Sequence, residues 1–301
     1  MTTTVTVCLC TFKRSSLGAT LLSLDKQDLP PGVALDIVVV DSDLAGSAHA
    51  LVSQTQATMT VPVRYVLAAR PGVAAARNKA VTEATGHWLA FIDDDETAAP
   101  NWLAQLLTCA ERFDAQVVFG ALLTIYPSAC PEWIKTGDLF GRQLPPTGTY
   151  VNHGPTGNTL VARAVLDGEQ TIFDLAYGTT GGEDTELFFR LSKKGVQMVT
   201  CREALVSETV ETLRLNRNFL LRKALRVGET YYRIFFANQG KAARAALLTK
   251  ALFQGVAASV IAGVLLPFGL GRSMRYQIKA AANFGKLRAA SGYAAVELYK
   301  G

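Results

Sequence analysis

Two apolar runs near the start of the chain each end in aspartate, and this pattern limits the possible folds more than any other feature. Residues 35–41 read LDIVVVD and residues 88–95 read WLAFIDDD. Continuous apolar runs rich in Val and Ile are typical of strands buried on both faces of a parallel sheet. Because helices must cover both faces of such a sheet, the two runs predict an α/β domain.

Other strand and helix patterns alternate with these runs through the first 200 residues. Shorter apolar stretches predict strands at residues 5–9, 63–67, 116–122 and 158–162. Helical spacing, often bounded by Pro or Gly, predicts helices at residues 16–24, 73–85, 100–113 and 183–194. This alternation predicts an open, mostly parallel sheet with helices on both faces, which binds ligands at the carboxyl ends of its strands. The Pro- and Gly-rich residues 126–155 are expected to form a long surface excursion.

From residue 213 onward the pattern is helical and the charge changes sign. The first 201 residues carry 14 Lys and Arg against 20 Asp and Glu, whereas the remaining 100 carry 16 against 5. Residues 251–271 carry no charge, and about 20 such residues are the threshold for crossing a bilayer. Because Gln, Gly and Pro interrupt the segment, three alternatives stay open: it lies on or re-enters a membrane, it spans one, or it is an ordinary buried helix. We therefore predict two parts, residues 1–212 as the catalytic domain and 213–301 as a helical region for membrane association or dimerisation.

Charge and cysteine content indicate which kind of binding partner and which cellular compartment to expect. A basic, apolar tail suits an anionic membrane surface better than nucleic acid, and no nucleic-acid-binding motif accompanies it. The five cysteines form neither a CxxC pair nor a zinc-ligand spacing, and no signal peptide is evident at the N-terminus. We expect reduced thiols in a cytosolic compartment.

The aspartate triplet after the second apolar run is the strongest candidate site. Asp93, Asp94 and Asp95 repel one another, so a bound cation would stabilise them. Hard ions such as Mg²⁺ or Mn²⁺ prefer oxygen ligands and often bridge to phosphate, where they offset charge on a departing nucleoside diphosphate. The alternative is a solvated acidic turn that caps the next helix, with Asp95 or Glu96 near its N-terminus.

Two further groups of residues are candidates for chemistry. Glu183 and Asp184 follow two glycines and open a helix, where a carboxylate serves either as a general base for an acceptor hydroxyl or as a plain cap. Arg70, Gly72 and Arg77 suit phosphate contacts, although a turn before a solvated helix explains them as well. Polar residues at the ends of the first two strands suit a base or ribose, namely Thr11, Arg14 and Asp41.

Taken in order, these segments resemble family 2 glycosyltransferases of the GT-A fold over residues 4–200. The matching segments are VTVCLCTFKR, IVVVDSD, RPGVAAARNKA, WLAFIDDDE, TGNTLVAR and GGEDTELFFRL. The resemblance implies an inverting transfer from a nucleotide-sugar, with a UDP-sugar favoured. It implies that a uridine diphosphate site is lined by Thr11, Arg14, Asp41, Arg70, Gly72 and Arg77. It further implies ribose and phosphate contacts from Asp93 and Asp94, a metal ligand in Asp95, a catalytic base in Asp184 beside Glu183, and a donor-sugar pocket shaped by Gly157 and Asn158.

Two departures from the family pattern refine the expectation. The family often places a metal-binding His after the base helix, but this chain reads EALVSETVETLR there, so Glu208 joins Asp95 and Asp93 as a candidate ligand for Mn²⁺ or Mg²⁺. No Q-x-x-R-W element is present, which predicts a non-processive enzyme. The Glu in place of His, and the C-terminal region with its LRKALRVGETYYR segment and its end in GYAAVELYK, resemble the bacterial exopolysaccharide (succinoglycan-type) branch. That branch implies a lipid-linked or saccharide acceptor and a peripheral or monotopic location at the cytoplasmic face of the inner membrane.

Alternatives of other classes are a non-catalytic nucleotide-sugar-binding scaffold and a nucleotidyltransferase. The retained carboxylates Asp95 and Asp184 argue against a scaffold. A nucleotidyltransferase would carry a Gly-rich basic loop after its first strand, where this chain reads CTFKRSS. The apolar tail also leaves a homodimer as an alternative to membrane contact.

Overall fold

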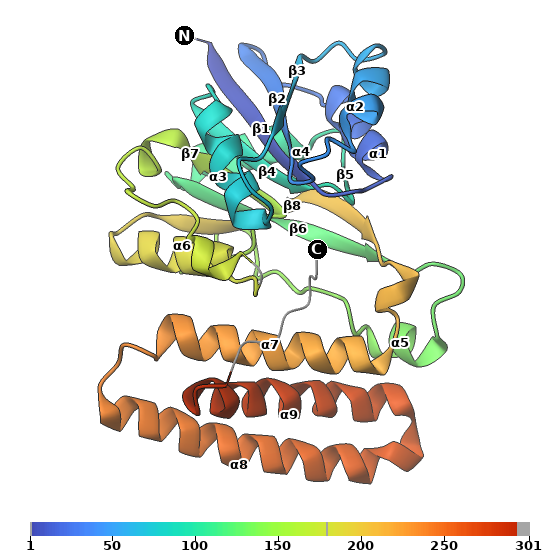
Figure 1. Cartoon of the computed structure of the whole chain (residues 1–301), viewed down its shortest axis with the longest axis vertical. Helices are drawn as coiled ribbons and strands as arrows, with labels where there is room; N and C mark the ends of the chain where they lie inside the picture. The colour runs from blue at the N-terminus through green and yellow to red at the C-terminus, as the bar shows by residue number, and fades with distance from the viewer. Residues whose placement is uncertain (1, 179, 294–301) are drawn as a thin grey trace.

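The computed structural model describes residues 2–178 and 180–293 and shows an α/β part above a layer of helices (Figure 1). The described strands form one sheet in the order β3-β2-β1-β4-β7-β6-β8-β5. Their bounds are β1 Thr3–Thr11, β2 Val33–Asp41, β3 Val63–Leu67, β4 Trp88–Asp93, β5 Glu96–Ala98, β6 Val117–Ile125, β7 Asn158–Ala162 and β8 Met198–Thr209. Only β7 and β5 run antiparallel to their neighbours, so the predicted open, mostly parallel sheet is confirmed.

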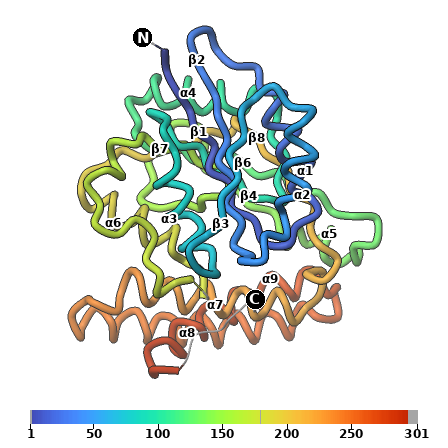
Figure 2. Tube along the Cα trace, turned by 45° about the horizontal axis from the view of Figure 1, so that its top comes forward, coloured from blue at the N-terminus to red at the C-terminus, as the bar shows by residue number. Residues whose placement is uncertain are grey.

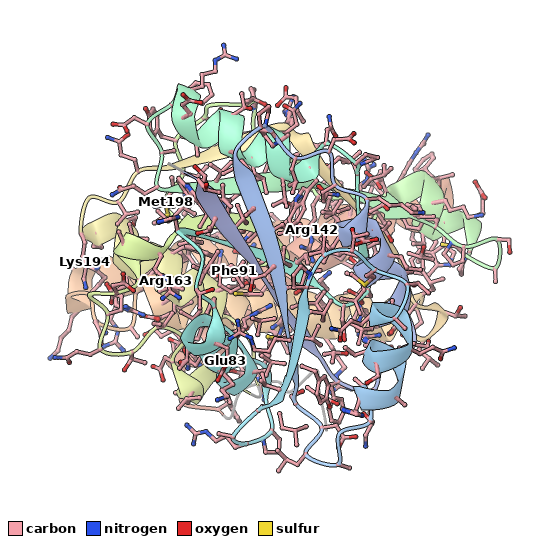
Figure 3. All side chains as sticks on the ribbon, turned by 90° about the horizontal axis from the view of Figure 1, so that it is seen from above. Glu83, Phe91, Arg142, Arg163, Lys194 and Met198 are labelled. Carbon is pink, nitrogen blue, oxygen red and sulfur yellow. The ribbon has the colours of Figure 1, made fainter. Side chains whose placement is uncertain are left out.

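Helices cover both faces of the sheet because successive strand residues point to opposite sides. In β2, Ile37 and Val39 pack against the helices of one face, which are α1 Leu17–Asp25, α2 His49–Gln56 and α4 Trp102–Arg112. Val38 and Val40 pack against those of the other face, α3 Val73–Glu83 and α6 Glu183–Lys193. Seen from above, Phe91 of β4 lies near the centre of the molecule and Glu83 of α3 lies nearer one edge (Figure 3).

The strands β3, β4 and β7 have the predicted bounds, whereas α2, β5 and β8 were not predicted. In β8 the apolar pattern is interrupted by Arg202 and Glu203, so its strand character depends on pairing with β6 and β5. The excursion predicted at residues 126–155 contains a short helix, α5 Glu132–Gly137. The side chain of Trp133 in this helix is partly buried against a hydrophobic cluster that includes Met274, so it has a packing role.

Three long helices, α7 Arg217–Phe235, α8 Lys241–Leu265 and α9 Leu270–Ala290, form the layer beneath the α/β part. Helix α7 faces the α/β part, α8 is farthest from it, and α9 lies between them (Figure 1). In the tilted view the same helices again lie together below the α/β part (Figure 2). Of the helical region predicted from residue 213 onward, residues 294–301 lie outside the described residues. The division at residue 212 stays a prediction.

Within the described residues one helix, Lys241–Phe268, is long and apolar enough to cross a membrane, with a mean hydropathy of 1.9. Only 22% of its apolar window is buried. The face toward α9 consists of small residues, Ala251, Gly255, Ala258 and Ala262. On the opposite face Val260 and Val264 are each 62% exposed. Within this chain α8 is therefore not an ordinary buried helix, and the two membrane alternatives and the homodimer stay predictions.

Candidate active site

The carboxyl ends of three neighbouring strands bring the first candidate residues together. In the parallel register Thr11 of β1 pairs with Asp41 of β2, and Cys10 pairs with Asp93 of β4. Because parallel strands end at the same edge of a sheet, side chains 82 positions apart meet at one rim. The aspartate triplet thus continues directly from the central strand.

Asp94, the middle member of the triplet, points into the protein. Its Oδ2 accepts hydrogen bonds from Thr11 Oγ1 at 2.7 Å and from the Phe12 backbone N–H at 3.3 Å, and the side chain is nearly buried. Burial raises the pKa of Asp94 to about 7, an effect that the Thr11 hydrogen bond opposes. Thr11 and Asp94 therefore join β1 to the end of β4, and in this structure they bond to each other.

Asp95 lies in a network of carboxylates and arginines. Its Oδ2 is 3.5 Å from Arg14 and 3.6 Å from Arg214. Arg214 also contacts Glu208 at 3.0 Å and Glu211 at 3.1 Å, and Arg14 pairs with Glu211. Burial is the main cause of the raised pKa values of Asp95 and Glu208, and Asp95 raises that of Glu208 further. Strand pairing between β5 and β8 places Glu208 opposite Glu96, which brings this distant segment to the triplet.

Beneath the triplet lies a carboxyl group that sequence reasoning did not select as a site residue. Glu96 is 2% exposed, and its Oε2 accepts a hydrogen bond from the Asp93 backbone N–H at 3.0 Å. Burial raises its pKa well above the usual range, and Asp93 adds to this shift. A Cβ at Gly157 would lie 2.8 Å from Asp93 Oδ2 and 3.0 Å from Glu96 Oε1, so any larger residue there would require these carboxyl groups to shift.

Arg77 connects the triplet to the base helix. Its guanidinium contacts Asp93 at 3.2 Å and forms a short ion pair with Glu183, the first residue of α6. Glu183 is almost fully buried, which raises its pKa, while Arg77 opposes that shift and Asp184 adds to it. A buried carboxylate needs such a partner, because an unpaired charge in the interior is costly.

Asp184, the second residue of α6, is only partly buried. Gly182 precedes the helix with φ +105°, a conformation that favours glycine and turns the chain into α6. One carboxylate oxygen of Asp184 accepts a hydrogen bond from the Thr185 backbone N–H at 2.6 Å. Burial lowers the pKa of His153, and the nearby Asp184 carboxylate opposes this shift. Of the two adjacent acids, Glu183 is thus held inside the protein and Asp184 is the more accessible.

Other predicted binding residues fall into two groups. Asp41 and Asn158 are buried and already bonded within the fold: Asp41 accepts from Tyr65 OH at 2.8 Å, and Asn158 accepts from Trp102 Nε1 at 2.7 Å. They therefore support the edge of the sheet that carries the triplet from inside the fold. Arg70 and Gly72 lie on the surface before α3, where Gly72 has φ +113°.

The carboxylates suit a hard divalent cation chemically, although a ready ligand cage is not formed. Among the described residues no three His, Cys, Asp or Glu side chains form a metal-binding group. Asp93 retains 46% side-chain exposure, whereas Asp95 and Glu208 contact arginines. Oxygen donors of this kind are those that Mg²⁺ and Mn²⁺ prefer.

Sequence reasoning also missed three residues that arrive from the C-terminal side. Glu211 and Arg214 reach Arg14 and Asp95, and Arg226 of α7 donates a hydrogen bond to the Thr180 carbonyl at 3.0 Å, just before α6. In ETVETLR the spacing of Glu208, Glu211 and Arg214, each three residues after the last, was a local signal for the first two.

Comparisons with known proteins show the family of this chain. A family model described as glycosyl transferase family 2 matches residues 6–162. Succinoglycan biosynthesis protein ExoM of Rhizobium meliloti (strain 1021) is 34% identical over 226 residues, which make up 75% of this chain and 73% of that protein. ExoO of the same organism is 34% identical over 87 residues, 29% of this chain and 24% of that protein.

Solved structures extend the likeness over nearly the whole chain. S. aureus TarS 1–349 in complex with UDP covers 97% of this chain and 92% of its own, with a TM-score of 0.52 and 14% identity. The complex with UDP-GlcNAc has the same coverage, with a TM-score of 0.51 and 15% identity. At this identity the likeness shows the fold alone, and it confirms the predicted GT-A type of fold.

Proposed function

Because the chain belongs to glycosyl transferase family 2, we propose that it moves one sugar per encounter from a nucleotide-sugar to a lipid-linked saccharide or other membrane-borne acceptor. A UDP-sugar is favoured as the donor, since the similar TarS fold was solved with UDP and with UDP-GlcNAc. A role in bacterial exopolysaccharide synthesis is supported by the described role of ExoM. Residues 1–212 would carry the chemistry and 213–301 the contact with the membrane.

One contact carries this proposal: Arg77 joins Asp93 of the triplet to Glu183 of the base helix. Asp184 directly follows Glu183, so this link supports a position for its carboxylate near the triplet. A diphosphate bound at Asp93 would then present its sugar toward Asp184. Arg77 and Arg14 supply cationic groups that pair with phosphate oxygens.

In the proposed reaction Asp184 is the catalytic base and Glu183 positions it. Asp184 removes the proton from an acceptor hydroxyl as that oxygen bonds to the anomeric carbon. The bond from this carbon to the diphosphate oxygen breaks, and its electron pair leaves with the nucleoside diphosphate. A single displacement of this kind inverts the anomeric centre. Glu183 holds the start of α6 against Arg77.

A Mn²⁺ or Mg²⁺ ion would be held by Asp93 and Asp95, with Glu208 as a further candidate ligand. When bound, the ion would neutralise charge on the diphosphate leaving group. The contacts of Asp95 are compatible with this role. Arg14 and Arg214 lie 3.5 and 3.6 Å from its carboxylate, which is longer than a tight ion pair.

We further propose that the protein lies on the cytoplasmic face of the bacterial inner membrane as a peripheral or monotopic enzyme. The exposed apolar face of α8 supplies the contact, and burying one such Val, Leu or Phe contributes about 1.5–3 kcal/mol. Helix α9 packs along α8 and carries Arg272, Arg275 and Lys279. A spanning α8 would pull these charges into the bilayer, so contact along the surface is favoured.

Calorimetric titration tests the proposal. UDP, GDP, CMP and dTDP are titrated with and without Mn²⁺ into the wild type, Asp95→Ala and a control, Asp167→Ala, which changes an exposed carboxylate on the far loop. Micromolar UDP binding that needs Mn²⁺ is expected in the wild type and the control and is lost in Asp95→Ala. If no nucleotide binds under any metal condition, the catalytic proposal is wrong.

A further inference from the structure

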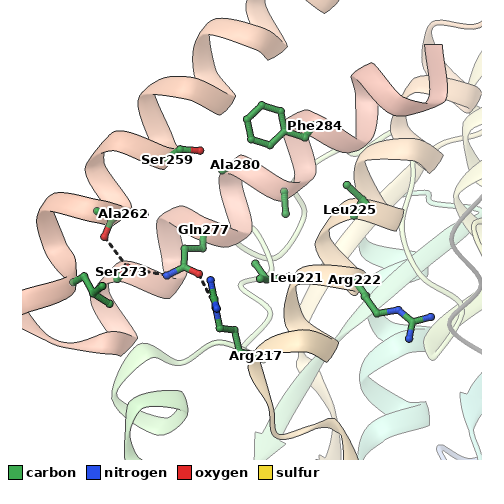
Figure 4. Close-up of a pocket in the computed structure, with 13 residues that line it drawn as sticks. Arg217, Leu221, Arg222, Leu225, Ser259, Ala262, Ser273, Gln277, Ala280 and Phe284 are labelled. Atoms are coloured by element: carbon green, nitrogen blue, oxygen red, sulfur yellow. Dashed lines mark hydrogen bonds between the residues drawn. The ribbon is translucent and has the colours of Figure 1, made fainter. Parts of the chain in front are cut away.

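A trough runs between the three C-terminal helices and lies outside the proposed active site. It has a volume of about 530 Å³, with α9 as its floor and α7 and α8 as its walls (Figure 4). Most of its lining is apolar or small, with Leu221 and Leu225 from α7, Gly263 from α8, Leu266 directly after α8, and Phe284 from α9. We call this space the helical trough.

The two ends of the helical trough differ chemically. At one end α7 and α9 touch, because Gly228 and Gly285 leave no room for a side chain: a Cβ at Gly228 would lie 1.9 Å from the Ala282 carbonyl oxygen. At the other end Arg217 donates to Gln277 Oε1 at 3.0 Å, and Gln277 donates to Ser273 Oγ at 2.9 Å (Figure 4). The trough is therefore apolar along its length and cationic at one end.

We propose that the helical trough binds the hydrocarbon chain of the lipid phosphate that carries the acceptor, an inference that rests on the proposed function. Volumes of 300–1,000 Å³ with apolar walls and few polar groups are typical of sites for small molecules. The negative charge of the lipid's phosphate suits Arg217 at the cationic end of the trough. It also suits the basic charge of the C-terminal region, where residues 202–301 carry 16 Lys and Arg against 5 Asp and Glu.

The trough borders the helix proposed to meet the membrane. Gly263 of α8 lines the trough, and Val260 and Val264, within one turn of it, are each 62% exposed. A lipid chain held in the trough would therefore lie beside the exposed apolar face of α8. A partner helix fits less well, since two turns about 10 Å wide occupy on the order of 850 Å³.

The trough also lies close to the chemistry. Leu225 lines it, and the next residue, Arg226, donates to the Thr180 carbonyl directly before Gly181 and the base helix. At the other end Arg217 lies three residues after Arg214, which contacts Asp95. One helix, about 10 Å thick, separates the lipid chain from the catalytic rim, so a chain held in the trough anchors its saccharide within reach of Asp184.

A photo-cross-linking experiment on the full-length protein tests this proposal. The probe is a polyprenyl phosphate with a diazirine in its chain, in phosphatidylcholine vesicles. Gly263→Phe fills the trough from a position where no atom lies within 4 Å of the new Cβ, and Ser259→Phe does so one turn away. The matched control, Ala257→Phe, places the same side chain on an exposed position of α8 outside the trough.

We expect the probe to label Leu221 and Leu225 in the wild type and in Ala257→Phe. In the two plugged variants, Gly263→Phe and Ser259→Phe, this labelling should fall at least tenfold. Labelling confined to Val260 and Val264, or equal labelling in the plugged variants, overturns the proposal. So does equal competition by phosphatidylglycerol, because the site would then hold bulk lipid. UDP titration of each variant is a separate readout: absent UDP binding contradicts the proposed function, while trough labelling decides the lipid site by itself.

Discussion

The guanidinium of Arg77 pairs with the carboxylate of Glu183, although 106 positions separate them in the chain. Both side chains are nearly buried, with 10% and 4% of their side-chain surface exposed. The pair is the physical link between the helix after β3 and the helix that carries the proposed base.

Replacing Arg77 by Met should lower the free energy of unfolding by about 3–5 kcal/mol, because Glu183 is left as a buried charge without its partner. Urea denaturation followed by circular dichroism measures the change. Arg64→Met is the control, since Arg64 pairs at the surface with Glu83 and should cost at most about 1 kcal/mol. Equal losses in the two variants would show that the Arg77 pair has no special role.

Asp184→Asn should reduce kcat by about 10²- to 10⁴-fold while leaving UDP affinity unchanged, because the variant loses the proposed proton acceptor and keeps the side-chain shape. Sugar transfer and UDP titration measure the two quantities. Glu186→Gln, on the same helix and paired with Arg190, serves as the control with near-normal kcat. A variant that changes only KM would contradict the role of Asp184.

Lys223 should make stability rise with pH above pH 8. Burial lowers its pKa from 10.5 to about 8, and Arg142 adds to the shift. Between these values the unfolded chain binds more protons than the folded one, so the free energy of unfolding increases with pH. Lys223→Met should remove this increase and stabilise the protein at pH 7 by on the order of 3 kcal/mol. Urea unfolding at pH 7, 8.5 and 10 checks this, and parallel curves for both proteins would refute it.

Gly228→Ala should destabilise the protein by about 1–3 kcal/mol, because the added Cβ would lie 1.9 Å from the Ala282 carbonyl and push α7 from α9. Gly263→Ala is the matched control within a helix, where open space should make the change stabilising by about 0.5–1 kcal/mol. Thermal unfolding distinguishes them. The same Tm for both variants would mean that the helices are not in close contact.

Replacing Val260 and Val264 together by Asp should weaken binding to anionic vesicles at least tenfold, since both side chains lie on the exposed face of α8. Co-sedimentation with phosphatidylglycerol vesicles measures it. Leu123→Asp and Ile125→Asp, exposed apolar positions at the end of β6, are the controls and should bind as the wild type. Unchanged binding of the α8 variant would contradict contact through this helix.

Much of the fold could be predicted from local patterns. The bounds of β4 and β7 agree with the apolar runs, because a strand buried on both faces is a continuous apolar segment between polar residues. The edge strand β3 also has its predicted bounds. Strand β8 escaped this reasoning, since Arg202 and Glu203 interrupt its pattern and its pairing with β6 is a contact between distant segments.

The same distinction holds for the candidate site. The triplet and the Glu183-Asp184 pair stood out because clustered acids at strand and helix ends are a local signal. Which of these acids are buried could not be read from the sequence, since the folded backbone directs Asp94 and Glu183 into the protein and leaves Asp93 and Asp184 more exposed.

The sequence by itself determined an α/β domain with a basic, apolar helical tail, because strand and helix periodicity and the distribution of charge are properties of neighbouring residues. Only the tertiary structure decided that Arg77 joins Glu183, that Glu96 lies beneath Asp93, and that α7 borders both the base helix and the trough. Burial and ion pairing depend on which distant segments the packed core brings together, and a pattern of neighbouring residues does not encode those pairings.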